Sequence, residues 1–399
     1  MAHLLFTNAR IILPDAIADD QALVVTDGMI EGCIPADQAS AIEAAGTVRS
    51  IDCKGQYLSP GFIDTHCHGG GGADFMDGKV EDILTAARAH LKHGTTGICP
   101  TTLTCSDGEL YTFFDAYRQA KEVAADMPHL LGIHLEGPYF SPAQAGAQPP
   151  AYLVHPKKAH YQEILEKGGA DIAKWSIAPE LPGAFALADA AAARGILLSI
   201  GHSDATFPVV QEALRHGFTQ LTHFYSGMST ITRVRGMRVL GVIECGYLFD
   251  ELDVEIIADG IHLPPELLQL IVKCKDHDKI CLVTDSMRGA DMPDGPSLLG
   301  SLANGVPVII QGGIANMPDF TSFAGSIATT DRLVRTMVQK AHLPLWEAVR
   351  MASFNPARFL KIDDRFGSIQ PGRAADLLVF DEDVQISSVY VSGVEVTLP

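Results

Sequence analysis

The sequence predicts an α/β protein in which a (β/α)8 TIM-like barrel carries a small β-sandwich formed by both chain termini. Three observations favour this fold class. Both ends of the 399-residue chain consist of short β-rich runs joined by turns. The middle alternates strand-like and helix-like segments, which is typical of a parallel sheet covered by helices. Several strand-like runs in the middle end in His, Glu or Asp, as in barrels whose strand ends build an active site.

The two ends of the chain are predicted to pair in one small domain. Asp27-Gly28 lies between two β-rich runs, and Ser392-Gly393 follows the last of them; such pairs favour tight turns. We therefore expect residues 1–57 and 360–399 to form the β-sandwich, around an inserted barrel of residues 58–359. The strands expected in the sandwich are 4–9, 22–26, 29–33, 50–53, 367–369, 375–380 and 386–391.

The middle of the chain predicts the barrel, because eight strand-then-helix units follow one another. A doubly wound open sheet is the alternative, but no G-x-G-x-x-G sequence opens a helix near the start of the chain. The expected barrel strands are 62–66, 96–100, 130–136, 174–178, 197–201, 220–223, 255–258 and 280–285. The expected helices include 80–93, 108–126, 184–194, 208–216 and 264–275.

Composition restricts the function classes. Hydrophobic residues make up 47% of the chain and charged residues 19%, which describes a packed globular protein. No apolar run approaches the roughly 20 residues that span a bilayer, and the net charge of −19 argues against nucleic acid and anionic membranes as partners. The start of the chain lacks a secretory signal, and the eight cysteines form neither a CxxC pair nor a disulfide framework. We therefore expect a cytoplasmic enzyme.

The first barrel strand ends in a His-x-His pair, His66 and His68. Residues two apart on a strand project from the same face, so both imidazoles reach one point in space. Imidazole is the commonest metal ligand in proteins, and this pair therefore makes half a metal site.

Four further strand-like runs end in a side chain of the same kind: Glu136, His202, His223 and Asp285. Each interrupts an apolar run, where burial of an unpaired polar group costs several kcal/mol. Because the carboxyl ends of barrel strands meet at one mouth, these side chains together favour a shared metal ion.

At these residues the chain resembles the amidohydrolase superfamily, and within it the N-acetylglucosamine-6-phosphate deacetylases. The resemblance covers nearly the whole chain and depends on the order of the motifs. They are Pro60-Gly61-Phe62-Ile63-Asp64-Thr65-His66-Cys67-His68, His134-Leu135-Glu136-Gly137-Pro138, Gly201-His202-Ser203, Thr222-His223, Ile257-Ala258-Asp259-Gly260-Ile261-His262, Leu282-Val283-Thr284-Asp285, Ala352-Ser353-Phe354-Asn355-Pro356-Ala357-Arg358 and Gly372-Arg373-Ala374-Ala375-Asp376-Leu377.

The resemblance implies a role for each of these side chains. It implies that Glu136, His202 and His223 hold the principal divalent metal, and that His66 and His68 can hold a second ion bridged by Glu136. One or two ions are therefore expected. Ligands of this kind suit zinc, while iron, cobalt and manganese would also fit.

The resemblance also implies the reaction. The expected substrate is an N-acetylhexosamine 6-phosphate, foremost N-acetylglucosamine 6-phosphate, with the galactosamine isomer open; the products are the amino-sugar phosphate and acetate. A bound divalent ion activates water, Asp285 is expected to act as general base and then acid, and His262 is expected to polarise the amide carbonyl.

Substrate recognition departs from the family's pattern. Gln148 stands where the family usually has a histidine, and Ser226-Gly227 stands in place of the family's Asn-Ala. An arginine-rich loop that includes Arg233 and Arg235 is a candidate phosphate clamp, because guanidinium binds phosphate in a bidentate fork. Ala324 belongs to a small-residue segment, 324–326, expected after the seventh strand as a pocket lining. A homodimer is implied, with the arginine loop shared between subunits.

Two other readings stay open. The chain could be a related amidohydrolase acting on another N-acyl substrate, such as an unphosphorylated amino sugar or an N-acyl amino acid, or it could be a metal-binding barrel without turnover. The intact Asp285 counts against the second. Cyclic-amide hydrolases commonly bridge their metals with a carboxylated lysine, and Glu136 at that position counts against them.

Overall fold

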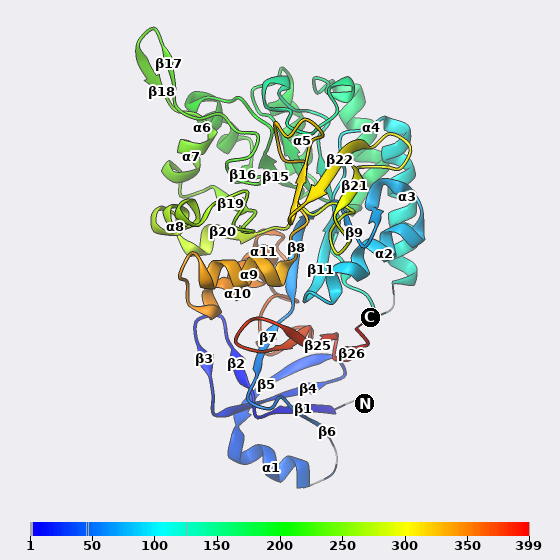
Figure 1. The fold of residues 1–399 in the computed structure, drawn as a ribbon, viewed down its shortest axis with the longest axis vertical. Coiled ribbons are helices and arrows are strands. Elements are labelled where there is room, and N and C mark those ends of the chain that lie inside the picture. The colour runs from blue at the N-terminus through cyan, green and yellow to red at the C-terminus, as the bar shows by residue number, and fades with distance from the viewer. Residues whose placement is uncertain (1–2, 45, 47, 125, 399) are drawn as a thin grey trace.

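A computed structural model describes residues 3–44, 46, 48–124 and 126–398. A barrel stands above a smaller β-rich part that contains both ends of the chain (Figure 1). No helix in these described residues is both long and apolar enough to cross a bilayer.

Eight parallel strands build the barrel within the described residues. Hydrogen bonds join them in chain order in two groups, β8 with β11 and β13 through β20. Two parallel bridges, Thr101 to His134 and Cys67 to Ser286, connect these groups into a closed ring. The predicted (β/α)8 fold class is therefore confirmed. The barrel strands are β8 (Phe62–Cys67), β11 (Thr95–Pro100), β13 (Ile133–Glu136), β14 (Ile172–Ile177), β15 (Leu197–Ile200), β16 (Phe218–Leu221), β19 (Asp253–Ile256) and β20 (Ile280–Leu282).

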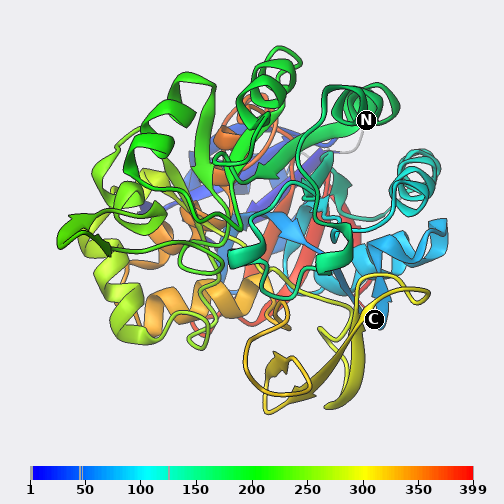
Figure 2. The ribbon, with the colours of Figure 1, turned by 90° about the horizontal axis from the view of Figure 1, so that it is seen from above.

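Helices surround the strands, as the view from above shows (Figure 2). They are α2 (Val80–Leu91), α3 (Asp107–Val123), α4 (Lys158–Gly168), α5 (Ala184–Ala192), α6 (Phe207–Arg215), α7 (Val242–Leu248), α8 (Pro265–Cys274), α9 (Thr330–Gln339), α10 (Leu345–Ala352) and α11 (Phe354–Phe359). α3 illustrates why they form: Ser106 and Glu109 make a reciprocal capping box at its start, and its apolar face, including Phe113 and Tyr117, is buried. Among these helices, the sequence did not locate α4, α7, α9, α10 and α11.

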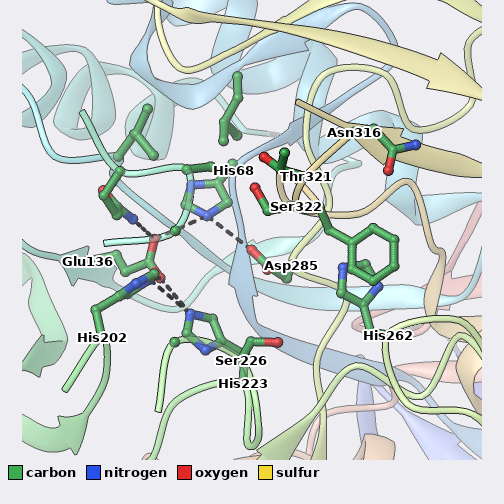
Figure 3. A pocket seen from close by; sticks show the side chains of 18 of the residues that line it. His68, Glu136, His202, His223, Ser226, His262, Asp285, Asn316, Thr321 and Ser322 are labelled. Atoms are coloured by element: carbon green, nitrogen blue, oxygen red, sulfur yellow. Dashed lines mark hydrogen bonds and ion pairs between the residues drawn. The ribbon is translucent and has the colours of Figure 1, made fainter. Parts of the chain in front are cut away.

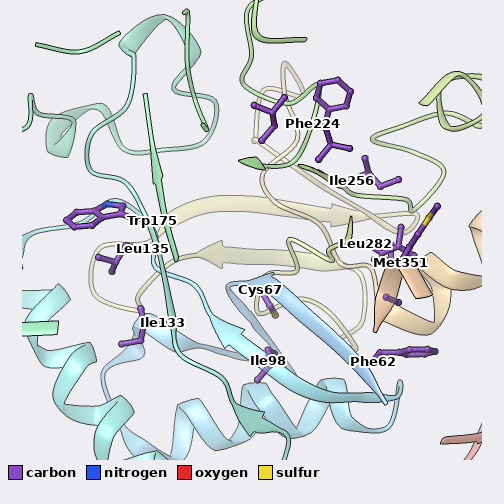
Figure 4. Packing of buried hydrophobic residues seen from close by; sticks show 14 of the residues in the cluster. Phe62, Cys67, Ile98, Ile133, Leu135, Trp175, Phe224, Ile256, Leu282 and Met351 are labelled. Carbon is purple, nitrogen blue, oxygen red and sulfur yellow. The ribbon is translucent and has the colours of Figure 1, made fainter. Parts of the chain in front are cut away.

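Aliphatic and aromatic side chains fill the space between the strands and the helices. Figure 4 shows Phe62, Ile98, Trp175, Leu282 and Met351 in this layer, all of them buried. Burial of such a continuous apolar layer is the main favourable contribution to folding of the barrel. It also holds the strand ends in fixed positions, on which the candidate site depends.

Both termini contribute to the second part of the molecule, which has two sheets with strand orders β5-β4-β1-β6 and β26-β25-β24-β7-β2-β3. β7 pairs antiparallel with β24, so the two ends of the chain share one sheet. The elements are β1 (His3–Thr7), β2 (Arg10–Ile12), β3 (Ile17–Ala18), β4 (Gln21–Thr26), β5 (Met29–Pro35), α1 (Ala36–Ala44), β6 (Arg49–Asp52), β7 (Tyr57–Pro60), β24 (Leu377–Phe380), β25 (Ile386–Val391) and β26 (Val394–Val396).

The prediction of a strand at 367–369 is wrong. These residues form bends, although Ile369 is buried in the apolar core of the sandwich. A backbone hydrogen bond from Ala374 N to Arg365 O closes the segment as a loop. Burial of one apolar side chain therefore does not require a strand partner.

Two excursions leave the barrel near its mouth. The antiparallel sheet of β21 (Gly295–Leu299), β22 (Val306–Gln311) and β23 (Ile314–Asn316) follows β20, and the hairpin of β17 (Thr232–Val234) and β18 (Met237–Val239) projects from the periphery (Figure 1). The short elements are β9 (Gly69–Gly70), β10 (Ala73–Asp74), β12 (His129–Leu130), η1 (Phe75–Asp77), η2 (Pro142–Gln144), η3 (Pro150–Tyr152), η4 (Gly169–Asp171) and η5 (His277–Lys279).

Candidate metal centre and active site

The strand-end residues meet at the barrel mouth (Figure 3). The sequence predicts strands as far as residues 223 and 285, but the observed strands end at Leu221 and Leu282. His202, His223 and Asp285 lie just beyond strand ends with φ of 47°, 32° and 50°. This left-handed conformation is uncommon in residues other than glycine and is found at functional sites.

Glu136, His202 and His223 form the first candidate ligand set. Glu136 Oε1 lies 3.2 Å from His202 Nε2 and 3.0 Å from His223 Nε2, and the two Nε2 atoms are 3.2 Å apart. His202 Nδ1 lies 2.8 Å from the backbone oxygen of Gln144. A proton on Nδ1 is thereby held by a carbonyl, which leaves Nε2 as the coordinating atom.

His66, His68 and Glu136 form a second candidate set. His66 Nε2 lies 3.5 Å from Glu136 Oε1, and His68 Nε2 lies 3.4 Å from Glu136 Oε2. Asp285 Oδ1 faces both rings, at 3.3 Å from His66 Nε2 and 3.1 Å from His68 Nε2. Glu136 therefore stands between the two sets and belongs to both.

The donor atoms fit a divalent cation. Both ring nitrogens of His66 and Nδ1 of His68 are buried without a hydrogen-bond partner among the described residues. A buried polar atom without a partner costs free energy, and an ion at this point would satisfy His66 Nε2, which faces Glu136. Imidazole nitrogen and carboxylate oxygen are also the ligands that zinc and similar ions take in hydrolytic sites.

The charges of the site keep its carboxylates ionised. Burial alone raises the pKa of Glu136, but the charge of His66 and the close approach of His202 and His223 to its carboxylate hold this pKa well below its usual range. Burial also raises the pKa of Asp285, and the charge of His66 with the hydrogen bond from His68 lowers it. Against the effect of burial, Asp285 and Glu136 raise the pKa of His66 to about 9. A divalent ion would take the place of this proton, because a ligating imidazole is neutral.

A buried polar layer supports His66 from the barrel interior. Lys174 and Glu255 form an ion pair in which both side chains are fully buried, and Thr65 Oγ1 donates to Glu255 Oε1 at 2.8 Å. Glu255 Oε2 lies 3.6 Å from His66 Nδ1, so its negative charge faces the ring without a hydrogen bond. His134 belongs to this layer and not to the ligands, since its Nε2 lies 2.7 Å from Ser176 Oγ.

The ligands open into a cavity of about 410 Å³. His262 stands in its wall, with its ring centroid 4.5 Å from that of Phe323. Asp259 Oδ2 lies 2.9 Å from His262 Nδ1, and Asp259 Oδ1 accepts hydrogen bonds from the backbone N–H groups of Ile261 and His262 at 2.8 Å each. Asp259 thus fixes both the loop and the ring of His262.

The residues expected to bind substrate lie at different places in the structure. Gln148, Ser226 and Gly227 line the cavity. Ala324 is fully buried, and its neighbour Gly325 forms that part of the wall. The segment 324–326 follows β20, the eighth barrel strand, so the expectation that it follows the seventh strand is wrong.

Arg233 and Arg235 lie apart from the ligands of the same chain. Both are exposed on the β17–β18 hairpin, which projects away from the mouth (Figure 1). Among the described residues that line the cavity there is neither a lysine nor an arginine. The structure therefore does not bring these two arginines into the cavity of their own subunit.

Sequence reasoning gave no role to Asp259 or Phe323. Asp259 carried a signal, because an aspartate followed by glycine favours a turn in which its carboxylate binds the backbone two residues on. Phe323 directly precedes the small-residue segment 324–326. Only the fold reveals that both side chains contact His262.

The fold and the ligand sets define a barrel built for metal-dependent hydrolysis, and the chain belongs to the amidohydrolase family, whose model matches residues 57–396. The chain is similar to the N-acetylglucosamine-6-phosphate deacetylase of Lysinibacillus sphaericus, with 34% identity over 98% of this chain and 97% of that protein. It is also similar to the N-acetylgalactosamine-6-phosphate deacetylase of Escherichia coli O157:H7, with 30% identity over 98% of this chain and 99% of that protein.

Among solved structures, a mutant N-acetyl-D-glucosamine-6-phosphate deacetylase of Mycobacterium smegmatis, in complex with N-acetyl-D-glucosamine-6-phosphate, matches with a TM-score of 0.88 and 27% identity. The match covers 100% of both chains. The resemblance indicated by the motifs is thus confirmed over the whole length of the chain.

Proposed function

We propose that the protein removes the acetyl group from an N-acetylhexosamine 6-phosphate, foremost N-acetylglucosamine 6-phosphate, and releases acetate and the amino-sugar phosphate. One observation carries the proposal: a carboxylate, Asp285, faces the two-histidine strand end of a buried ligand set and also borders the cavity. Relatives of both the glucosamine and the galactosamine type support the substrate class.

The chemistry divides between a divalent ion and two side chains. Glu136, His202 and His223 would hold a divalent ion, and such an ion would supply a water of lowered pKa as the nucleophile at neutral pH. Asp285 accepts the proton of the attacking water and delivers it to the nitrogen of the departing amine. In its protonated form His262 donates at both ring nitrogens, to Asp259 and to the acetyl oxygen on which negative charge develops.

We propose zinc as the ion, in one or two copies. The imidazole and carboxylate donors suit zinc, and the two sets that share Glu136 allow a second ion. Iron, cobalt and manganese use the same donors, and availability decides among them.

A homodimer would explain how the site binds the phosphate group of the substrate. The cavity wall offers no Lys or Arg from the described residues, whereas phosphate binding calls for such groups. The β17–β18 hairpin carries Arg233 and Arg235, and its apolar side chains Val234 and Met237 are 52% and 68% exposed. We propose that the hairpin packs on a second copy of the chain and brings its arginines to that subunit's cavity.

An unphosphorylated N-acyl substrate is the second candidate, favoured by the same lack of cationic side chains among the described residues of the cavity wall. The ligand sets and Asp285 serve either substrate, because the acetyl group is cleaved in the same way. The two candidates therefore differ only in what binds the far end of the sugar.

We infer a cytoplasmic location. All eight cysteines are free, among them Cys33, Cys105 and Cys274, which are not fully buried. Free thiols in a protein of this kind suit a reducing compartment.

The test is acetate release from three substrates by the zinc-loaded protein: N-acetylglucosamine 6-phosphate, N-acetylgalactosamine 6-phosphate and unphosphorylated N-acetylglucosamine. We expect kcat/KM to be at least about 100-fold higher for a phosphorylated sugar, since hydrogen bonds to charged groups contribute roughly 1.5–3 kcal/mol each. Equal rates with and without phosphate would favour the second candidate. No acetate from any of the three would refute deacetylation of amino sugars.

A further inference from the structure

Gln148 lines the cavity, but its side chain is only 4% exposed and both ends of its amide are already engaged. The residue lies in the loop after η2, where its own N–H donates to the backbone oxygen of Ala145 at 3.0 Å. This turn directs the side chain toward Glu136 and away from solvent.

The orientation of the amide follows from its partner at Thr104. The backbone N–H of Thr104 lies 2.9 Å from Gln148 Oε1, and an N–H requires an acceptor, so the amide oxygen must be on that side. The amide nitrogen is therefore on the other side, where Gln148 Nε2 donates to Glu136 Oε2 at 2.7 Å. Hydrogen bonds to an ionised carboxylate are stronger than those between neutral groups.

The oxygen that Gln148 binds is not the one that His202 and His223 approach. Those two imidazoles face Glu136 Oε1, while Oε2 has Gln148 on one side and His68 Nε2 at 3.4 Å on the other. A carboxylate held at Oε2 cannot rotate about its terminal bond. Its Oε1 therefore stays aimed at the point where the histidine nitrogens converge.

We propose that Gln148 is a positioning residue for the metal centre, which fixes the carboxylate of Glu136, and not a ligand of the sugar. This inference rests on the metal centre of the proposed function, but not on the identity of the substrate. Partners of ligating side chains typically change metal affinity by about 10- to 100-fold when they are removed.

Residue 148 must offer one hydrogen-bond donor and one acceptor on two atoms that are bonded to the same carbon. Glutamine meets it with its amide, and a neutral imidazole meets it with its two ring nitrogens. Leucine has a branched apolar side chain that is one atom shorter, and it meets neither demand. Gln148→His should therefore preserve the arrangement, whereas Gln148→Leu should release Glu136.

The test is a zinc titration of the metal-free protein, without substrate, against a competing chelator. We expect the zinc dissociation constant to rise at least about tenfold in Gln148→Leu and to stay within about threefold of the original protein in Gln148→His. Gln269→Leu is the matched control, since the Gln269 amide is exposed and donates to the backbone oxygen of Lys340. Circular dichroism of each variant establishes that it is folded.

Two results would overturn the proposal. Unchanged zinc affinity in Gln148→Leu with a raised KM would make Gln148 a sugar ligand. A loss of zinc affinity in Gln148→His as large as that in Gln148→Leu would show that the donor and acceptor pair is not what matters. Because no substrate enters the titration, an error in the proposed substrate leaves both results interpretable.

Discussion

At the scale of single residues, the site depends on carboxylates that stay ionised although they are buried. Glu136 is 2% exposed and Asp285 8%, and burial of an isolated charge is costly. The neighbouring imidazoles offset this cost, as the lowered pKa values of both groups indicate. Each carboxylate is thus available as a ligand or base near neutral pH.

Asp285 is expected to be essential for turnover and dispensable for folding. Asp285→Asn keeps the size of the side chain but removes the proton acceptor, so kcat should fall by about 10²- to 10⁴-fold. Acetate release measures the loss, and circular dichroism with metal analysis serves as the control. Unchanged turnover in a folded, metal-loaded variant would contradict the role assigned to Asp285.

The Lys174–Glu255 pair allows a stability test at the same scale. Burial alone raises the pKa of Glu255, and Lys174 lowers it to about 2, so Glu255 is ionised inside the barrel. Lys174→Met leaves a buried carboxylate without its cation and should cost about 3–5 kcal/mol of unfolding free energy.

Urea denaturation of Lys174→Met, Glu255→Leu and the double variant measures this coupling. The double variant should be more stable than the sum of the single effects predicts, because it removes both charges together. Strict additivity would show that the two side chains do not stabilise each other.

At the scale of elements, the barrel strands hold the chemistry and the excursions between them hold recognition. Of the candidate site residues, His66 and Glu136 lie on β8 and β13, and the others lie just after β8, β15, β16 and β20. The β17–β18 hairpin lies between β16 and β19 and the β21–β23 sheet follows β20. Loops on a rigid scaffold commonly carry specificity in this way.

The arginines of the hairpin are expected to contribute to the binding of phosphorylated substrates only. Arg233→Ala with Arg235→Ala should raise KM for the phosphorylated sugar at least about tenfold, as expected when a charged hydrogen bond of roughly 1.5–3 kcal/mol is lost, and leave KM for the unphosphorylated sugar unchanged. Steady-state kinetics measures both constants, and light scattering reports the oligomeric state.

Arg194→Ala is the matched control, because Arg194 is an exposed arginine in the turn after α5, where its Nη1 donates to the backbone oxygen of Ala190. An equal rise in KM for both sugars, or none, would show that the hairpin does not bind phosphate.

The sequence predicted the candidate ligands because each one breaks an apolar run, a pattern that is visible without knowledge of the fold. It could not predict the hydrogen bond between Gln148 and Glu136, since a glutamine in a loop belongs to no periodic pattern. It misjudged the strand ends at residues 223 and 285, where the chain turns into the left-handed region. It predicted Arg233 as a candidate phosphate ligand but could not predict where this side chain lies, because only the fold shows the direction of the hairpin.

At the scale of the whole molecule, the sandwich and the barrel meet at specific contacts. β7 ends at Pro60 and pairs with β24 in the sandwich sheet. We therefore propose a domain boundary near Pro60, not after residue 57, with residues 360–399 completing the sandwich. His129 of β12 also reaches across, with Nε2 3.1 Å from Asp376 Oδ2.

The His129–Asp376 contact should make stability depend on pH. Burial alone lowers the pKa of His129, but Asp376 outweighs it and raises this pKa above the usual value. A raised pKa in the folded state stabilises the protein below the unfolded value of about 6.5. That contribution is lost as the pH rises through the folded value.

His129→Gln should therefore reduce the unfolding free energy by about 1 kcal/mol or less at pH 5.5, and by a smaller amount at pH 9. Denaturation at both pH values measures the difference. His155→Gln, at an exposed histidine, is the control. An equal effect of His129→Gln at both pH values would rule out a charged contact.

The way the barrel closes has a consequence for the order in which the working protein is made. Glu136 and His223, 87 residues apart, come from strands of one sheet. The ring closes where the chain after β20 meets β8: Asp285 N donates to His66 O, and Thr284 Oγ1 donates to Asp64 Oδ2. These contacts join residues about 220 apart in the chain. Contacts so distant along the chain form late, because long loops are costly to close. We therefore expect a growing chain to bring Glu136 and His223 together before Asp285 joins them, and activity to require the closed ring.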